Sequence, residues 1–173
     1  MKNNIILLGF MGCGKSTVGK TLAKQLNFDF CDCDSLAEQR SKKTVSQIFA
    51  DEGEAFFRKL ETKIITELCS KQGQIIATGG GAVLNSQNVE ALRNSGIVVF
   101  LDVSNETVLK RLSGDTSRPL LAREDKETAV KELMTARYPL YSKAAHITIN
   151  ANSDAEDVAK KIIDAFTSRI QQS

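Results

Sequence analysis

Residues 9–16 read Gly-Phe-Met-Gly-Cys-Gly-Lys-Ser and match the phosphate-binding pattern G-x-x-x-x-G-K-[S/T]. The stretch follows the apolar run Ile5–Leu8 and precedes a segment of helical period, which is the setting that such a loop requires. Glycines let the backbone N–H groups wrap the phosphates, and the start of the helix adds the positive end of its dipole. Lys15 would then contact the β- and γ-phosphates, and the Ser16 hydroxyl would bind Mg²⁺. The alternative is a chance glycine-rich turn, and the flanking elements argue against it.

Two acidic residues, Asp32 and Asp34, follow the second apolar run. The usual acidic partner of a phosphate-binding loop ends another strand, but the run Ile75–Ala77 leads instead to Gly79–Gly81. If the extended backbone persists, residues 32 and 34 share one face and point into the same crevice. A helix N-cap is the alternative for Asp34, and a tight turn is the alternative for the glycines. Because open α/β sheets bind ligands beyond the carboxyl ends of their strands, we expect three strand ends to converge on one pocket.

Five short apolar runs alternate with longer segments of helical period. The expected strands are Ile5–Leu8, Phe28–Cys31, Ile75–Ala77, Ile97–Leu101 and Ile147–Ile149. This alternation predicts an α/β fold, with a five-stranded parallel sheet covered by helices on both faces. Two helices carry an apolar residue at every fourth position, namely Phe56, Leu60, Ile64 and Leu68 in one and Val158, Ile162, Phe166 and Ile170 in the other. The second opens with Ser153-x-x-Glu156, the pattern of a capping box.

The composition is typical of one globular domain. The chain has 173 residues, 42% of them hydrophobic, and 23 basic residues against 21 acidic ones give a net charge of +2. These values predict a single domain, residues 1–173, with a core of its own. A balanced charge without a run of Lys or Arg argues against nucleic acid as a partner. The run Ile5–Leu8 is too short for a signal peptide or a membrane span, which predicts a soluble, cytoplasmic protein with no membrane partner.

Several other features favour a structural interpretation. The four cysteines are expected to be reduced thiols that act as small buried side chains: Cys13, Cys31, Cys33 and Cys69. A zinc site at Cys31-x-Cys33 is the alternative, but the remaining ligands are missing. The one histidine, His146, is expected to pack in the last strand or at its edge rather than act as a general base. The absence of an Asn-Lys-x-Asp motif argues against a GTPase.

Six short motifs occur together and in register. They are the Gly-Phe-Met-Gly of the loop, Asp32-x-Asp34, Phe57-Arg58, Gly79–Gly81, Arg118-Pro119-Leu120-Leu121 and Arg137-x-Pro139-x-Tyr141. Together they resemble the shikimate kinase family, from the first strand to the end of the chain. The resemblance implies a three-layer P-loop kinase fold with a mobile lid at residues 113–125 and a substrate-binding segment at residues 33–61. It also implies ATP-dependent phosphorylation of the 3-hydroxyl of shikimate with Mg²⁺, giving shikimate 3-phosphate and ADP on the route to chorismate and the aromatic amino acids.

The resemblance further implies a role for each matching residue. The implied catalytic residues are Lys15, Asp34 and Arg118, and Asp34 would take the proton of the attacking hydroxyl. Shikimate would be bound by Asp34, Arg58, Gly79, Gly80, Gly81 and Arg137, with the two arginines on its carboxylate. The nucleotide would be bound by Gly12, Cys13, Gly14, Lys15, Ser16, Thr17, Arg111, Arg118 and Asn152, with Arg111 stacked on the adenine. Ser16 and Asp32 would serve Mg²⁺, the carboxylate through water.

Guanidinium groups suit a small carboxylate, but each of these arginines has a simpler alternative. Arg58 could be solvated on its helix, and Arg137 could end a helix where a cation favours the dipole. Glu61, one turn from Arg58, could hold it in place or form an ordinary surface pair. Segment 113–125 could be a polar connection rather than a lid. As a lid, it would bring Arg118 to the transferred phosphoryl group and exclude water.

Two other functions stay open at this point. Another small-molecule P-loop kinase, acting on gluconate or a nucleoside monophosphate, would share the fold and the nucleotide site. The set of Asp34, Arg58, Arg137 and the three glycines suits a small carboxylate better. A non-catalytic nucleotide switch would have no need of Arg118. The expected partners are therefore ATP and shikimate, and the family precedent favours a monomer.

Overall fold

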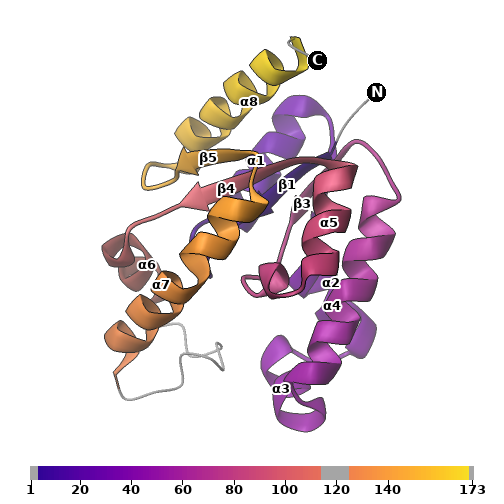
Figure 1. Ribbon diagram of the computed structural model, residues 1–173, viewed down its shortest axis with the longest axis vertical. Helices are drawn as coiled ribbons and strands as arrows, with labels where there is room; N and C mark the ends of the chain where they lie inside the picture. Colours follow the sequence, from indigo (N-terminus) through magenta and orange to yellow (C-terminus); the bar gives the residue numbers. More distant parts are fainter. Residues whose placement is uncertain (1–3, 114–124, 172–173) are drawn as a thin grey trace.

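The computed structural model describes residues 4–113 and 125–171, and its centre is one parallel sheet (Figure 1). The strands are β1 (Asn4–Leu8), β2 (Asp29–Asp32), β3 (Gln74–Ala77), β4 (Gly96–Asp102) and β5 (Ile147–Asn150). Their order across the sheet is β2-β3-β1-β4-β5, and every pairing is parallel. All five predicted strands are confirmed, with bounds that differ by no more than one residue at either end.

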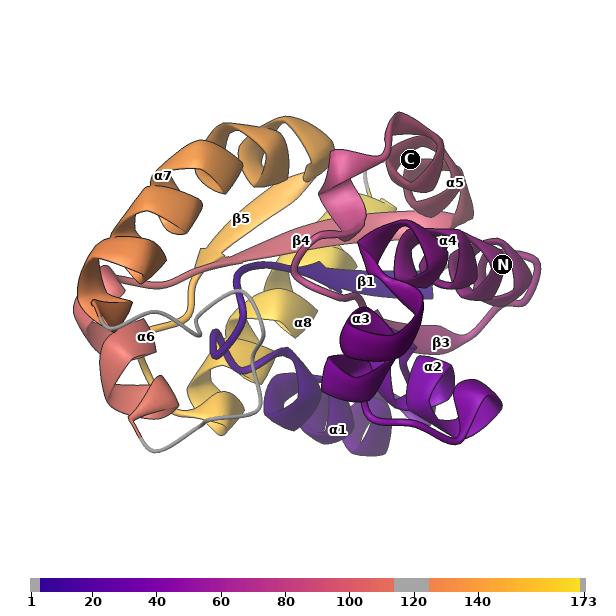
Figure 2. The same ribbon diagram turned by 90° about the horizontal axis from the view of Figure 1, so that it is seen from below.

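Helices cover both faces of this sheet. They are α1 (Lys15–Leu26), α2 (Cys33–Ser41), α3 (Val45–Glu52), α4 (Glu54–Cys69), the short 3₁₀ helix η1 (Ala82–Leu84), α5 (Ser86–Ser95), α6 (Asn105–Leu112), α7 (Lys126–Ala144) and α8 (Ala155–Gln171). Figure 2 shows α1 and α8 on one side of the strands and α4, α5 and α7 on the other. The predicted three-layer arrangement is therefore confirmed. Of the expected lid, residues 114–124 lie outside the described part of the chain.

The sheet supplies the centre of the core. Ile5, Ile6 and Leu7 of β1 are each 0% exposed, because β1 has β3 and β4 as neighbours and helices on both faces. β1 is therefore the central strand, and the order of the strands along the chain changes direction beside it. Ligands bind at this point in open α/β sheets, so the fold directs attention to the loop that follows β1.

The predicted apolar stripe of α4 is partly wrong. Ile64 and Leu68 are buried as expected, but Phe56 is 45% exposed and Phe57 is the buried aromatic residue. The helix begins at Glu54, directly after Gly53, and its buried face also includes Ile65. A repeat of exactly four residues therefore drifts off the buried face, because a helix has 3.6 residues per turn.

In α8 the predicted stripe is confirmed for Val158, Ile162 and Phe166, which are at most 8% exposed, whereas the side chain of residue 170 is outside the described part. The capping box is wrong by one residue. Asp154 caps the helix, since its Oδ1 accepts the Asp157 N–H at 2.9 Å.

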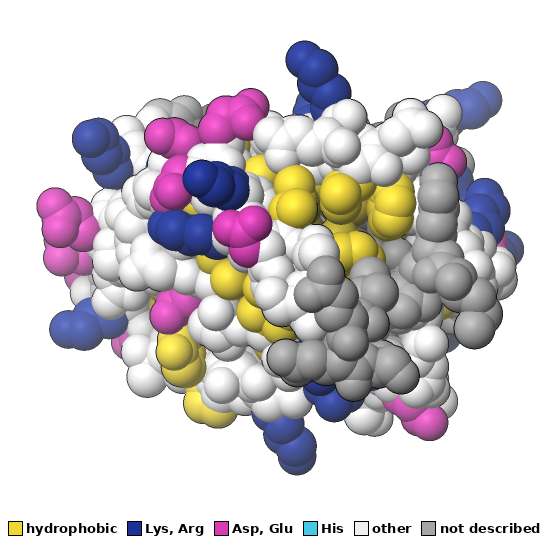
Figure 3. All heavy atoms as spheres, turned by 90° about the horizontal axis from the view of Figure 1, so that it is seen from above, with side chains coloured by type: hydrophobic (Ala, Val, Ile, Leu, Met, Phe, Trp, Pro, Cys, Tyr) yellow, Lys and Arg dark blue, Asp and Glu magenta, His cyan; other side chains and the backbone are white. Residues whose placement is uncertain are grey.

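The described surface carries mixed charge. Figure 3 shows acidic and basic side chains side by side on the face seen from above, with a smaller group of hydrophobic side chains between them. None of the helices in the described ranges is both long and apolar enough to span a bilayer. All four cysteines are free thiols. Cys13 and Cys33 are buried as expected, whereas Cys31 and Cys69 stay partly exposed.

Candidate active site

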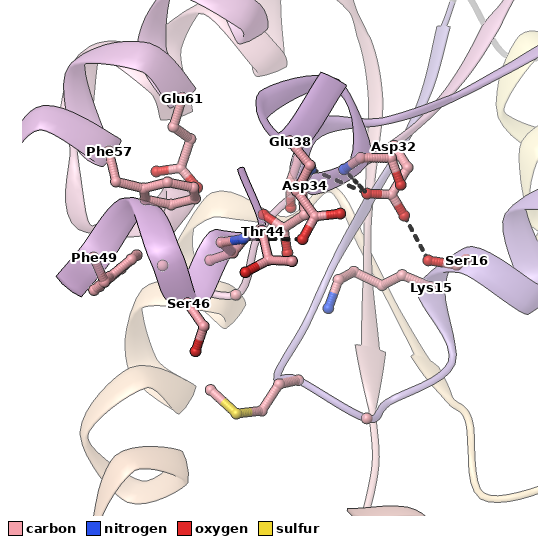
Figure 4. Close-up of a pocket in the computed structure, with 18 of the residues that line it drawn as sticks. Lys15, Ser16, Asp32, Asp34, Glu38, Thr44, Ser46, Phe49, Phe57 and Glu61 are labelled. Atoms are coloured by element: carbon pink, nitrogen blue, oxygen red, sulfur yellow. Dashed lines mark hydrogen bonds between the residues drawn. The ribbon is translucent and has the colours of Figure 1, made fainter. Parts of the chain in front are cut away.

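A cavity of about 510 Å³ opens at the carboxyl ends of β1, β2 and β3. Most of the residues expected to act in catalysis or binding line it, namely Gly12, Gly14, Lys15, Ser16, Thr17, Asp32, Asp34, Arg58, Gly79, Gly80, Gly81 and Arg137. The expected convergence of three strand ends on one pocket is therefore what the fold produces. Figure 4 shows that Lys15 and Asp34 border the same space, from α1 and α2 respectively.

The phosphate-binding loop joins β1 to α1 at the base of this cavity. Gly12 and Gly14 have φ values of +75° and +98°, in the left-handed region that favours glycine, and α1 begins at Lys15. The Lys15 ammonium donates to the Gly9 carbonyl at 2.7 Å and the Phe10 carbonyl at 3.0 Å. The lysine thus curls back over its own loop, with its charge beside the backbone that would receive phosphates.

Ser16 and Asp32 meet at one side of the loop. The Ser16 hydroxyl donates to Asp32 Oδ2 at 2.6 Å, while Asp32 Oδ1 accepts the N–H groups of Asp34 and Ser35 at 3.0 and 3.1 Å. Asp32 is therefore the N-cap of α2, and the N-cap alternative for Asp34 is wrong. The expectation that the strand continues to residue 34 is also wrong, because the cap starts the helix at Cys33.

Glu61 is the most deeply buried charged group of the site. It is 2% exposed, and within the described part of the chain its Oε1 has no hydrogen-bond partner. A Cβ added to Gly79 would lie 2.5 Å from this oxygen and 2.9 Å from Asp34 Oδ1, so both carboxylates crowd against one glycine. Burial raises the pKa of Glu61 above its ordinary value, although the charge of Arg58 opposes the shift.

The two arginines reach the cavity from different helices. Arg58 of α4 pairs with Glu61 at 2.9 Å and with Glu54 at 3.1 Å, and only 21% of its side chain is exposed. Arg137 is 6% exposed and lies within α7, which continues to Ala144. Neither simpler alternative holds, because Arg58 is not solvated and Arg137 does not end a helix. Glu61 is likewise no surface residue, and it does hold Arg58.

A family model described as shikimate kinase matches residues 11–167. The chain belongs to the shikimate kinase family. The shikimate kinase of Trichormus variabilis is 41% identical over 171 residues, covering 98% of this chain and 94% of that protein. The shikimate kinase of Geobacter sulfurreducens is 45% identical over 159 residues, or 92% and 88% of the two chains. A solved structure of shikimate kinase from Acinetobacter baumannii in complex with shikimate superposes with a TM-score of 0.95 at 42% identity, covering 98% of this chain and 95% of that one.

Three of the residues that the family resemblance assigned to the nucleotide lie beside the cavity rather than in it. Cys13 is buried, and its carbonyl accepts a hydrogen bond from Arg111 Nη1 at 3.0 Å. Arg111 Nη2 also donates to the Ala151 carbonyl at 3.3 Å, and so connects the phosphate-binding loop to the loop after β5. Asn152 lies in that second loop, where its Oδ1 accepts the Ser104 N–H at 3.0 Å. Arg118 falls outside the described residues.

Helix α3 forms one wall of the cavity and lies inside the expected substrate-binding segment 33–61, although sequence analysis assigns a role to none of its residues. Val45, Ser46 and Phe49 line the cavity, and Phe49 packs on Phe57 with ring centroids 5.0 Å apart. The other lining residues to which sequence analysis assigns no role are Met11, Ser35, Glu38, Thr44, Phe57 and Thr78, whereas Glu61 is expected only as a possible support of Arg58. The segment from Arg40 to Glu54 is polar and has only Val45, Ile48 and Phe49 to bury. Two of them, Val45 and Phe49, face the cavity.

His146 is confirmed as a structural residue of the sheet edge. Its Nδ1 accepts the Val98 N–H at 3.0 Å, and its own N–H donates to the Val98 carbonyl at 2.8 Å. Burial lowers its pKa, with help from the charges of Arg93 and Arg169. A neutral imidazole engaged in this way has no part in the cavity.

Glu61→Gln is expected to stabilise the protein at neutral pH. The folded state raises the pKa of Glu61, so protonation stabilises the fold below the unfolded pKa, and this contribution is lost as the pH rises through the folded pKa. The glutamine has no charge to bury. Its advantage in melting temperature over wild type should therefore grow as the pH rises from about 4 to about 8.

The matched control is Glu54→Gln, which removes the exposed partner of the same arginine. Scanning calorimetry of the three proteins across this pH range should give parallel curves for Glu54→Gln and wild type. A melting-temperature difference for Glu61→Gln that shrinks as the pH rises would contradict the assignment.

Proposed function

We propose that this protein transfers the γ-phosphoryl group of ATP to the 3-hydroxyl of shikimate, giving shikimate 3-phosphate and ADP for the synthesis of chorismate and the aromatic amino acids. One observation carries the proposal. A single cavity holds a phosphate-binding loop and, on its other walls, a carboxylate and two arginines, Asp34, Arg58 and Arg137. Its volume of about 510 Å³ is in the ordinary range for small-molecule sites.

Shikimate is a small anion that carries one carboxylate and several hydroxyls. Arg58 and Arg137 would bind the carboxylate, because guanidinium groups present paired N–H donors that match its geometry. Glu61 supports this role, since it fixes the orientation of Arg58 before the substrate arrives. The backbone of Gly79–Gly81 would line the same end of the pocket, where the lack of side chains lets the substrate approach closely.

Asp34 would accept the proton of the 3-hydroxyl as that oxygen attacks phosphorus. The β–γ bridging oxygen of ATP leaves with the electron pair of the broken P–O bond, so the protein has little covalent chemistry to perform. Positioning and charge stabilisation are then the main contributions. The start of α1 and the Lys15 ammonium supply positive charge on the nucleotide side.

The residues beside the phosphate-binding loop fit Mg²⁺. The Ser16 hydroxyl donates to Asp32 Oδ2 at 2.6 Å, so two hard oxygen atoms of the kind that this ion prefers lie next to each other. Mg²⁺ takes few protein ligands and keeps waters and phosphate oxygens, so a hydroxyl and a carboxylate suffice. When bound, it would neutralise charge on the phosphates. Ser16 would hold it directly, and Asp32 through water.

The remaining nucleotide contacts are proposed from the family resemblance. Arg118 would stabilise the transferred phosphoryl group from a lid at residues 113–125. Arg111 would stack on the adenine, beside a loop that contains Asn152; its tether to the Cys13 and Ala151 carbonyls supports a fixed place for its guanidinium group. On the precedent of the family, we further propose a cytoplasmic monomer consisting of one domain.

Arg58→Ala should raise the KM for shikimate by about 30-fold, because the loss of one charged hydrogen-bonding group of a pair costs about 2 kcal/mol. The measurement is ADP release with MgATP against shikimate, quinate, gluconate and nucleoside monophosphates. Turnover on shikimate, and its weakening in the variant, is the expected result. The KM for ATP should stay within about twofold of wild type, since the arginine lies away from the nucleotide loop.

The control variant is Arg40→Ala, which removes an exposed arginine paired with Glu67 and should leave both KM values unchanged. Turnover only on gluconate or a nucleotide would keep the fold and the loop but overturn the acceptor. Absence of turnover on every compound would favour a nucleotide-binding switch.

A further inference from the structure

The hydroxyl of Tyr141 connects α7 to the loop Gly79–Gly81, and the reaction described above assigns it no role. It donates a hydrogen bond to the Gly80 carbonyl and is hydrogen-bonded to Arg137, one helical turn earlier. A Cβ added to Gly80 would lie 3.7 Å from both Arg137 Nη1 and Tyr141 Oη, so both side chains lie against the same glycine. One hydroxyl can serve both partners, since it accepts from the guanidinium while it donates to the carbonyl.

The ring of Tyr141 is held in one place. The residue is 2% exposed, and its ring stacks on Phe100 of β4 with centroids 5.2 Å apart and planes 27° apart. Burial raises the pKa of Tyr141 to about 12, so the hydroxyl keeps its proton throughout the physiological pH range. It is therefore a permanent donor to the Gly80 carbonyl.

This hydrogen bond fixes the orientation of the Gly80–Gly81 peptide. The described chain has no cis peptide bonds, so the N–H of Gly81 points away from the carbonyl of Gly80 and hence away from Tyr141. Gly81 lines the cavity, and a Cβ on it would clash with the guanidinium of Arg58. Arg58 therefore lies beside Gly81 and Arg137 lies beside Gly80, and all four residues line the cavity. Glycine offers little steric resistance to a flipped peptide, so an external hydrogen bond is needed to select one orientation.

We propose that Tyr141 is a positioning residue for the acceptor carboxylate, whose hydroxyl aims Arg137 and turns the Gly81 N–H toward the anion. This inference rests on the proposed function, because the anion is the carboxylate of shikimate. Without the hydroxyl, Arg137 loses an acceptor in a buried setting and the Gly80 carbonyl loses its donor. The binding of the acid should then weaken, while binding of the nucleotide does not.

The test is Tyr141→Phe, which keeps the ring and its stacking on Phe100. The matched control is Tyr138→Phe, since these are the only two tyrosines of the chain and Tyr138 is 46% exposed on the same helix. Tyr141→Phe should raise the KM for shikimate about tenfold, with kcat and the KM for ATP within about twofold of wild type. It should also weaken discrimination against a shikimate analogue whose carboxylate is replaced by a hydroxymethyl group. Tyr138→Phe should change none of these values.

An unchanged KM for shikimate, or an equal loss for both substrates, would overturn the inference and leave Tyr141 a packing residue. If the wild-type protein does not phosphorylate shikimate, the proposed function is wrong. The role of Tyr141 is then tested separately, by comparing the calorimetric affinity of wild type and of Tyr141→Phe for shikimate. If Tyr141→Phe does not fold, 3-fluorotyrosine incorporated into Tyr138→Phe places one fluorine at Tyr141. Its NMR signal should move when shikimate is added and stay when the hydroxymethyl analogue is added. A fluorine chemical shift that does not change when shikimate is added would overturn the proposal.

Discussion

Asp34→Asn is expected to lower kcat for the phosphorylation of shikimate by about 10²–10⁴-fold, the usual contribution of a positioned general base. Asparagine has the shape of aspartate but cannot take a proton from the attacking hydroxyl. The fold should tolerate the change, because α2 is capped by Asp32 rather than by Asp34. The KM for ATP should stay near its wild-type value, since the nucleotide loop is untouched. Steady-state rates with each substrate varied in turn are the measurement.

The control for this substitution is Asp29→Asn, which removes an exposed carboxylate at the start of β2, the strand that precedes α2. It should keep full activity. If Asp34→Asn retained kcat within about fivefold of wild type, another group would be taking the proton, and the general-base assignment would be wrong. A loss confined to the KM for ATP would instead place Asp34 on the nucleotide side.

The elements that sequence analysis predicted well are those whose signal is local. One example is the strand Ile5–Leu8 with the phosphate-binding loop that follows it. This stretch contains both an apolar run and the glycines of a turn, so its structure depends little on the rest of the chain. The order β2-β3-β1-β4-β5 has no such local signal. Apolar runs show that strands exist, but the choice of neighbours depends on how the helices pack.

The errors come from competition between local and tertiary effects. Asp32 and Asp34 were expected to share a face by strand alternation, but the Asp32 side chain accepts two backbone N–H groups and starts the helix at once. Both carboxylates still line the cavity, because Asp32 is the N-cap of α2 and Asp34 lies in its first turn. Phe56 and Phe57 are adjacent aromatic residues of similar propensity, and only the packing of α4 decides which one is buried.

The wall formed by α3 illustrates a third kind of limit. Phe49 is an apolar residue with no regular pattern around it, and the sequence offers no reason to put it beside Phe57, eight positions away in another helix. The contact exists because Gly53, at φ +84°, turns the chain sharply between α3 and α4. Such a wall of a ligand cavity depends on the angle between two helices, which a single sequence does not encode in any short segment.

Gly79→Ala should lower kcat/KM for shikimate by at least about 100-fold, since a misplacement of about 1 Å in a reacting group has a cost of this size. The new Cβ would lie 2.5 Å from Glu61 Oε1 and 2.9 Å from Asp34 Oδ1, so at least one carboxylate must move. Glu61 can yield little, because it is 2% exposed and bound to Arg58. Either its movement disturbs Arg58, or Asp34 moves away from the substrate hydroxyl.

The neighbouring substitution Gly80→Ala separates this effect from a general sensitivity of the loop. The nearest atom to its Cβ would be the Met11 backbone nitrogen at 3.5 Å, which is ordinary van der Waals contact, so the loss in kcat/KM should stay within about tenfold. The measurements are the steady-state rates and the melting temperatures of Gly79→Ala and Gly80→Ala. Equal losses in the two would mean that the loop backbone, rather than the positions of Asp34 and Glu61, limits the reaction. A large loss in Gly79→Ala alone, with the melting temperature kept, would show that the empty Cβ position at Gly79 is what allows a base and an arginine anchor to meet the same small substrate.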